Sequence, residues 1–288
     1  MRIVIAPDKL QGSLGARDVA ENIATGLREV LPQATIDIVP MADGGEGTAE
    51  VICNALGGSW LKCEAHDPLG RGIDARYAWI DDRKLAVMEM SEAAGMRRLL
   101  ESERDPLRAT TFGIGEMVLD ATNRGAQEII IGLGGSATND GGLGMARALG
   151  FRFLRVDGVV IASAADLPAL GRIEKMNVAK LARIIAAVDV RNPLLGERGA
   201  TRVFASQKGA TAEQIELLER ALTKLADTVA RDLGCDFRDE SGAGAAGGLG
   251  FGLMSFCDAK IQSGFDEVAS LCNHESKMKN TSNGITGE

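Results

Sequence analysis

The sequence is poor in the residues that build most metal centres and disulfide frameworks. It contains two histidines, His66 and His274, and five scattered cysteines with no CxxC pair. We therefore expect no histidine-rich metal site, no zinc site and no disulfide framework. The histidines stand in a turn and in a polar tail, where we expect both to be solvated.

Long apolar runs and an excess of positive charge are also missing. No run approaches the roughly 18 apolar residues of a membrane-spanning helix, and the apolar start at residues 3–6 is too short for a signal peptide. Lys and Arg total 32 against 40 Asp and Glu, which gives a net charge of −8. A nucleic-acid-binding surface needs clustered positive charge. We expect a cytoplasmic, reduced protein that binds neither nucleic acid nor membrane.

Glycine is what the chain has in excess. Of 288 residues, 36 are glycine, against a usual share of about 7%. Apolar residues at 45% and charged residues at 25% are ordinary for a globular protein. At ~150 residues per domain, the length favours two domains or one large α/β domain.

Short buried strands alternate with helices at the start of the chain. Apolar, β-branched runs predict strands at 2–6 and 35–39, and helical spacing from Arg17 to Leu31 predicts a helix between them. This β-α-β order predicts parallel pairing. Residues 60–90 change to alternating runs with a turn, which predicts antiparallel strands, so we place a domain boundary near residue 60.

Later segments return to the helix and strand alternation. We expect buried strands at 127–131 and 183–190, and helices at 143–149 and after Thr211, where Thr211 and Gln214 form a capping box. The chain is therefore predicted to be an α/β protein of two domains.

Acidic residues follow several of these strands. Asp8, Asp43, Asp140 and Asp189 all stand where a predicted strand ends. Ligands of open α/β sheets gather at the carboxyl ends of strands, and carboxylates there suit metal binding or proton abstraction. A capping role for the acidic residues, and a solvated Lys9, are the simpler alternatives.

The loop GLGGSATNDGG, residues 132–142, directly follows a predicted strand and precedes a helix. Glycines let the backbone approach a ligand, and a helix N-terminus offers N–H groups to an anion. We therefore interpret the loop as a phosphate or carboxylate site, with a tight turn as the alternative. It lacks the GxxxxGK[ST] pattern of a P-loop.

A second loop, GAGAAGGLG at residues 242–250, matches GxGxxG by letter. No strand precedes it, so the dinucleotide fingerprint is incomplete. Close helix packing and contact with a nucleotide remain open for this loop. A nicotinamide-dependent oxidoreductase is suggested by this loop alone.

Together these residues resemble the bacterial type 1 glycerate kinase family. The stretches that carry the resemblance span residues 2 to about 265 and are, in chain order, IVIAPDK with GSL, PMADGGEGT, ERDPLRATTFGIGE, IIIGLGGSATNDGGLGMARALG, VDVRNPLLG with RGA, QKGAT and GAGAAGGLG. The resemblance implies phosphorylation of D-glycerate to 2-phosphoglycerate, with ATP and Mg²⁺ as cofactors. D-glycerate and ATP would be the partners, and a homodimer is compatible with the resemblance.

The resemblance also implies an architecture. A Rossmann/flavodoxin-like parallel-sheet domain would comprise residues 1–60 plus 280–288, with its C-terminal completion missing, and a large inserted α/β (α+β) domain would comprise residues 61–279.

The implied site combines the strand-end acids with the glycine loop. Either Asp189 or Asp8 would take the hydroxyl proton, and either Asp140 or Asp189 would hold Mg²⁺. The predicted catalytic residues are Asp8, Lys9 and Asp189, and the predicted metal ligands are Asp189 and Asp140. The predicted substrate- and phosphate-binding residues are Asp43, Glu46, Gly134, Gly135, Ser136, Asn139, Asp140 and Lys208.

The chain departs from the family pattern in ways that lead to an alternative expectation. Leu10-Gln11 stand where the family usually has Phe-Lys or Tyr-Lys, and the chain stops about 90 residues before members normally end. We therefore also expect a truncated protein of weak or no activity that only binds glycerate or nucleotide. A structural or oligomerising protein is the remaining class, which the polar, glycine-dense loops support poorly.

Overall fold

The structure is a computed structural model that describes residues 1–10, 13–176, 178, 180–279 and 281–287. In these residues the strands form three sheets. The smallest pairs β7 (Phe151–Arg155) with β8 (Leu170–Lys175) in antiparallel fashion. A three-stranded parallel sheet has the order β11 (Asn283–Ile285), β1 (Arg2–Ile5), β2 (Thr35–Ile38).

The largest sheet has six strands. Their order is β10 (Lys260–Gln262), β9 (Arg183–Ala187), β6 (Glu128–Gly132), β5 (Leu85–Glu89), β4 (Gly72–Ile80), β3 (Ser59–His66). The four strands from β10 to β5 pair in parallel, whereas β4 and β3 are antiparallel to their neighbours. This confirms the predicted antiparallel region between residues 60 and 90.

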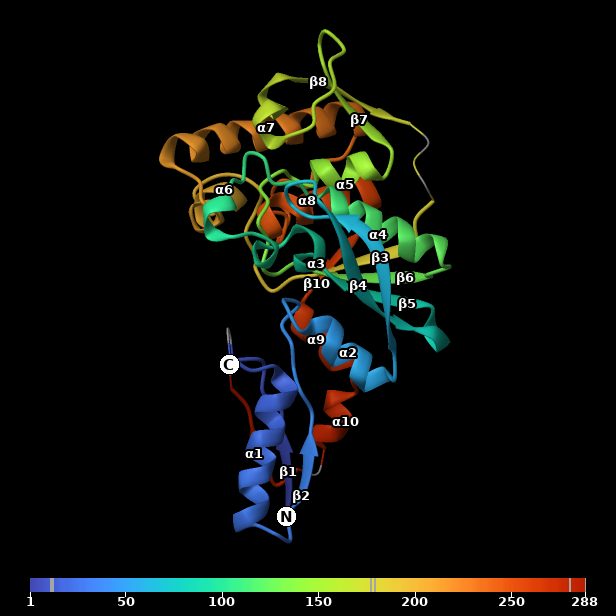
Figure 1. Cartoon of the computed structure of the whole chain (residues 1–288), viewed down its shortest axis with the longest axis vertical. Helices are drawn as coiled ribbons and strands as arrows, with labels where there is room; N and C mark the ends of the chain where they lie inside the picture. Colours follow the sequence, from blue (N-terminus) through green and yellow to red (C-terminus); the bar gives the residue numbers. More distant parts are fainter. Residues whose placement is uncertain (11–12, 177, 179, 280, 288) are drawn as a thin grey trace.

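Helices surround these sheets. They are α1 (Ala16–Val30), α2 (Thr48–Leu56), α3 (Ser91–Ala94), α4 (Phe112–Asn123), α5 (Leu143–Ala148), α6 (Ala200–Phe204), α7 (Ala212–Leu233), α8 (Ala245–Cys257), α9 (Gly264–Leu271) and α10 (His274–Met278). Figure 1 shows an elongated molecule with the three-stranded sheet and α1 at one end, the large sheet and α7 toward the other, and α2 and α9 between them. Among the described residues, no helix combines the length and apolar character that crossing a membrane requires.

The large sheet is buried on both faces. Along β5, Leu85 and Val87 belong to the apolar cluster that includes α2 and α9, while Ala86 and Met88 belong to the cluster that includes α4, α5 and α8. Successive side chains of a strand point to opposite faces. A strand covered on both sides therefore has the continuous apolar run that the sequence shows.

The three-stranded sheet confirms the predicted β-α-β unit. β1 and β2 pair in parallel, and α1 buries Ala20 and Ala24 against Ile3 and Ile5. β11 pairs in parallel with the other edge of β1. Helix α2 precedes residue 60 in the sequence, but it packs on β4 and β5 of the large sheet.

The long helix α7 begins as predicted. The Thr211 side chain accepts a hydrogen bond from the backbone N–H of Gln214, and the Gln214 side chain accepts one from the N–H of Thr211. Gly234 ends the helix with φ at +74°, a left-handed conformation that glycine adopts without strain.

Candidate functional site

The carboxyl ends of β5, β6, β9 and β10 meet at one edge of the large sheet because these four strands run in parallel. The loop at residues 42–47, which follows β2, lies against this edge. A Cβ built on Gly44 would be 2.9 Å from the carbonyl oxygen of Ala187, and one built on Gly134 would be 2.6 Å from the Cα of Gly45. The two backbones touch, so glycine is needed at these positions.

This contact brings several predicted site residues together. Lys9 Nζ donates a hydrogen bond to the carbonyl oxygen of Glu46 over 2.6 Å, and the N–H of Gly45 donates to Asp43 Oδ1 over 2.9 Å. A Cβ built on Gly45 would be 2.8 Å from Asp43 Oδ1 and 3.4 Å from Lys9 Nζ. An ammonium group and a carboxylate therefore flank one short stretch of backbone. Gln11, where the family has a lysine, lies outside the described residues.

Asp189 follows β9 at the same edge. Its Oδ1 accepts a hydrogen bond from Ser263 Oγ over 3.1 Å, while the side chain remains open to solvent. Partial burial raises the pKa of Asp189, and the negative charge of Asp43 raises it further, against the lowering effect of hydrogen bonds from Ser263 and from the backbone of Gly264 and Phe265. Asp43 and Asp189 thus lie near enough for their charges to interact.

A cavity of about 400 Å³ opens beside this cluster, between β2, the start of α1 and α2. Asp8, Lys9 and Glu46 line it, as does His274. His274 is buried, with 6% of its surface exposed, so the expectation that it is solvated was wrong. The volume falls in the ~300–1,000 Å³ range of small-molecule sites.

The outer and inner parts of the first glycine loop are placed differently. Gly134, Gly135 and Ser136 reach the edge where the loop at 42–47 lies, and a Cβ on Gly135 would be 2.7 Å from Glu46 Oε1. Ser136 is held by a strand-like bridge to Gly95. Of these predicted binding residues, Gly134 and Gly135 therefore adjoin Glu46.

Asp140 points the other way, into the core. Its Oδ2 accepts hydrogen bonds from the N–H and hydroxyl of Thr111 and the N–H of Gly144, and its Oδ1 accepts one from the N–H of Gly142. Complete burial raises the pKa of Asp140, and these hydrogen bonds oppose that shift. Both oxygens are thus engaged by the protein, and the prediction that Asp140 binds Mg²⁺ stays a prediction.

Asn139 and Lys208 are buried next to Asp140. Asn139 donates from Nδ2 to Thr201 Oγ1 over 3.0 Å, and Lys208 donates from Nζ to the carbonyl oxygen of Thr138 over 2.7 Å. Burial lowers the pKa of Lys208 to about 7. Both residues are buried, and their predicted role in ligand binding stays a prediction.

The second glycine loop packs against the first. Ala246, Gly247 and Gly248 all have positive φ within α8, and the carbonyl oxygen of Gly247 accepts a hydrogen bond from the N–H of Gly141 over 3.1 Å. The residues before this loop form a turn rather than a strand. This favours close packing over nucleotide contact and removes the basis for an oxidoreductase.

Glu89 at the end of β5 is a site residue that the sequence analysis missed. Its Oε1 accepts hydrogen bonds from the N–H groups of Gly47 and Ala49, over 2.9 and 3.1 Å, at the start of α2. Burial raises the pKa of Glu89. A carboxylate at the end of a buried strand was the signal used for Asp189, and it applied equally here.

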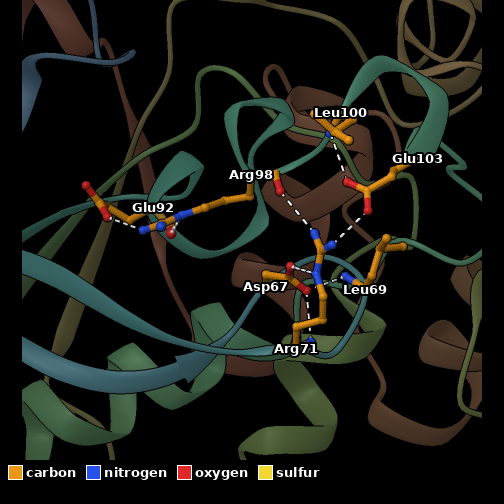
Figure 2. A network of polar contacts seen from close by, with 7 residues as sticks. All are labelled: Asp67, Leu69, Arg71, Glu92, Arg98, Leu100 and Glu103. Atoms are coloured by element: carbon orange, nitrogen blue, oxygen red, sulfur yellow. Dashed lines mark hydrogen bonds and ion pairs between the residues drawn. The ribbon is translucent and has the colours of Figure 1, made fainter.

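A group of arginines after β5 was also missed. Figure 2 shows Arg98 reaching Glu92, while Arg71 donates to the backbone carbonyl of Arg98 and to the side chains of Asp67 and Glu103. This network fixes the segment after α3 to the turn between β3 and β4. Among the described residues, no three His, Cys, Asp or Glu side chains are grouped so that they could hold a metal ion.

Comparisons with known proteins agree with this architecture. A glycerate kinase from Halalkalibacterium halodurans is 42% identical over 290 residues, which are 99% of this chain and 76% of that protein. A glycerate 2-kinase from Escherichia coli is 41% identical over 292 residues, which are 100% of this chain and 77% of that protein.

A solved structure shows the same mixed α/β fold. The crystal structure described as glycerate kinase 2 from Salmonella typhimurium has a TM-score of 0.89 and 43% identity, over 100% of this chain and 78% of that one. The sequence pattern of the Glycerate kinase family matches residues 3–288. The chain therefore belongs to the Glycerate kinase family.

Proposed function

We propose that this chain transfers the γ-phosphoryl group of ATP to the 2-hydroxyl of D-glycerate, which yields ADP and 2-phosphoglycerate. The observation that carries the proposal is the meeting of Lys9, Asp43 and Asp189 at one edge of the large sheet, beside a cavity of about 400 Å³. The name of the Escherichia coli relative, glycerate 2-kinase, supports the choice of carbon.

Phosphoryl transfer needs positioned groups more than covalent chemistry from the protein. The glycerate hydroxyl oxygen bonds to the γ-phosphorus, the bond from that phosphorus to the bridging oxygen of ADP breaks, and the hydroxyl proton leaves. We assign the proton to Asp189, because its raised pKa strengthens it as a base. Asp8 is the second candidate, since it lines the cavity.

The ammonium group of Lys9 supplies positive charge next to the phosphates. Its bond to the carbonyl oxygen of Glu46 fixes it in place, and ammonium groups neutralise phosphate as point charges. The outer loop residues Gly134, Gly135 and Ser136 would carry an anionic group of either substrate.

The carboxylates present fit a magnesium ion. Mg²⁺ is usually held by one or two protein carboxylates together with substrate phosphates, and Asp43 and Asp189 interact electrostatically at this edge. We propose Asp43 as its principal ligand in place of Asp140. When bound, Mg²⁺ neutralises charge on the phosphates.

We also infer that the chain has the two domains that the resemblance implies. The three-stranded parallel sheet, with α1 packed on it, supports a Rossmann/flavodoxin-like domain. The large sheet, with its parallel and antiparallel parts, supports an inserted α/β (α+β) domain.

Product analysis tests the proposal. The purified chain is incubated with ATP, MgCl₂ and D-glycerate, and the product is followed by proton-coupled ³¹P NMR. Phosphate on carbon 2 has one neighbouring proton and gives a doublet, whereas phosphate on carbon 3 gives a triplet. A doublet supports the proposal, a triplet changes the product, and calorimetric binding of both substrates without ADP release supports the alternative of a binding protein.

A further inference from the structure

A hollow of about 370 Å³ beside α3 carries positive charge on a chain whose net charge is −8. Its lining has four cationic side chains and two carboxylates, namely Lys62, Asp74, Arg76, Glu92, Arg97 and Arg98. An excess of cations in a concave site raises the local concentration of small anions. The proposed phosphoryl transfer uses none of these residues.

Glu92 gathers three of the guanidinium groups. Arg97 Nη2 lies 2.6 Å from Glu92 Oε1, Arg98 Nη2 lies 2.8 Å from Oε2, and Arg76 Nε lies 3.5 Å from Oε1. The Glu92 side chain is 11% exposed. One carboxylate balances one guanidinium, so this cluster retains positive charge.

Arg97 and Arg76 keep donors for a further partner. Arg97 uses Nε for the carbonyl oxygen of Ser91 and Nη2 for Glu92, and within the described part of the chain no partner occupies its Nη1. Arg76 lies over the Trp60 ring, 4.4 Å from its centroid, and its side chain is 56% exposed. A guanidinium has five N–H donors in a planar fork that matches a carboxylate or phosphate.

The arginines are held in place before any ligand arrives. The carbonyl oxygen of Arg98 accepts a hydrogen bond from Arg71, which Asp67 and Glu103 hold on their side (Figure 2). Positioned donors bind an anion without a further ordering cost.

The hollow adjoins the proposed active site. A smaller hollow of about 80 Å³ is lined by Arg76 and Arg97, by the carboxylates of Glu89 and Glu92, and by Gly47 and Glu50 at the start of α2. Gly47 and Glu50 also line the 400 Å³ cavity that contains Lys9. The smallest hollow therefore shares lining residues with each of the other two.

We propose that Arg76 and Arg97 form a binding site for the carboxylate or phosphate group of a small molecule. The side chains act as a paired clamp, with Glu92 as the counter-ion that aligns them. The proposal concerns binding alone and does not require that the chain transfers a phosphoryl group.

Calorimetric titration of three probes tests the site and identifies the source of the anion. Inorganic phosphate, D-glycerate and ATP are titrated separately into the full chain and into its Arg97→Gln and Arg76→Gln variants. A hydrogen bond to a charged group contributes about 1.5–3 kcal/mol, so we expect each variant to bind at least one probe about tenfold more weakly. The probe whose binding weakens identifies the anion that the clamp binds.

A matched control removes a guanidinium elsewhere. Arg172 pairs with Glu174 on β8 and is 47% exposed, and it lines none of the three hollows, so Arg172→Gln should bind all three probes as the unaltered chain does. If Arg97→Gln and Arg76→Gln also bind all three probes unchanged, the proposal is overturned.

Glu92→Gln should change the affinity for the probe in the opposite direction. Removing the negative charge should tighten binding of the same probe by severalfold at low salt and steepen its weakening by added salt. If Glu92 served only to hold the segment together, the folded variant would bind the probe no more tightly, which contradicts the clamp. If Glu92→Gln does not fold, the two arginine variants alone test the proposal. The titrations measure binding and not turnover, so they also test the proposal on an inactive chain.

Discussion

Acidic residues in two regions of this molecule have the same sequence context but opposite surroundings. At the sheet edge, Asp43 and Asp189 are exposed and each accepts few hydrogen bonds. In the core, Asp140 accepts four hydrogen bonds from Thr111, Gly142 and Gly144. The edge carboxylates are open to solvent, whereas both oxygens of Asp140 are hydrogen-bonded within the fold.

The glycine loop divides between these two regions. Its outer part at residues 134–136 meets the loop at 42–47, and its inner part at residues 138–142 meets α8. A glycine-rich loop therefore performs two tasks within eleven residues. Substitutions should separate the regions: at the edge they should lower rate, and in the core they should lower stability.

Asp189→Asn should have the largest effect. A positioned general base contributes ~10²–10⁴-fold to rate, so kcat should fall by that factor while the midpoint of thermal unfolding stays close to that of the unaltered chain. Coupled ADP release and calorimetry measure the two quantities. Asp8→Asn tests the second candidate base in the same assay, and near-normal turnover of Asp189→Asn with a large loss in Asp8→Asn would assign the proton to Asp8.

Asp140→Asn should mainly lower stability. The new amide would place an N–H₂ group against backbone N–H donors, and each unsatisfied buried donor costs ~1–3 kcal/mol. We expect the free energy of unfolding to fall by about 3 kcal/mol, measured by urea denaturation. The folded fraction should retain its affinity for Mg²⁺, and a large loss of that affinity would return Asp140 to the metal site.

Lys9→Met should lower kcat/KM for ATP by about 10- to 100-fold, the equivalent of one charged hydrogen bond. The cause is loss of the ammonium group that adjoins Asp43 and Glu46. Lys84→Met, which removes a surface lysine paired with Asp81, is the control and should leave steady-state kinetics unchanged. Equal kinetics in both variants would place Lys9 outside the site.

Lys208→Met should change the pH dependence of stability. The folded pKa of Lys208 is about 7, while an unfolded lysine titrates near ~10.4. Between these values unfolding takes up a proton, so stability should rise with pH from about 7 to about 10, by at most ~1.4 kcal/mol per unit. Urea denaturation across this range should show that rise, and the variant should lack it. A variant with the same slope would assign the rise to other groups.

The sequence predicted the elements better than it predicted the site. Strands such as Arg2–Ile5 and Glu128–Gly132 are continuous apolar runs, and their burial follows from composition alone. Hydrophobic periodicity is a local signal, and it sufficed for the antiparallel strands and for the capped helix α7. Strand β11 contains no apolar run, so hydrophobic periodicity did not predict it. It pairs with one edge of β1.

The sequence did not predict which polar side chains point into the core. Asn139 and Asp140 are polar residues in a polar loop. Asn139 bonds to Thr201, 62 residues away, and Asp140 bonds to Thr111, 29 residues away. Lys208 likewise meets Thr138 across 70 residues. Polar burial depends on partners that distant parts of the chain supply, and no local pattern names them.

The position of β11 has a consequence for the order of events during synthesis. The six described strands of the large sheet lie between residues 59 and 262, so all of them are synthesised before β11. The first strand of the chain must wait for Asn283–Ile285 to fill its free edge. The small parallel sheet therefore joins strands that are made before and after the described strands of the large sheet.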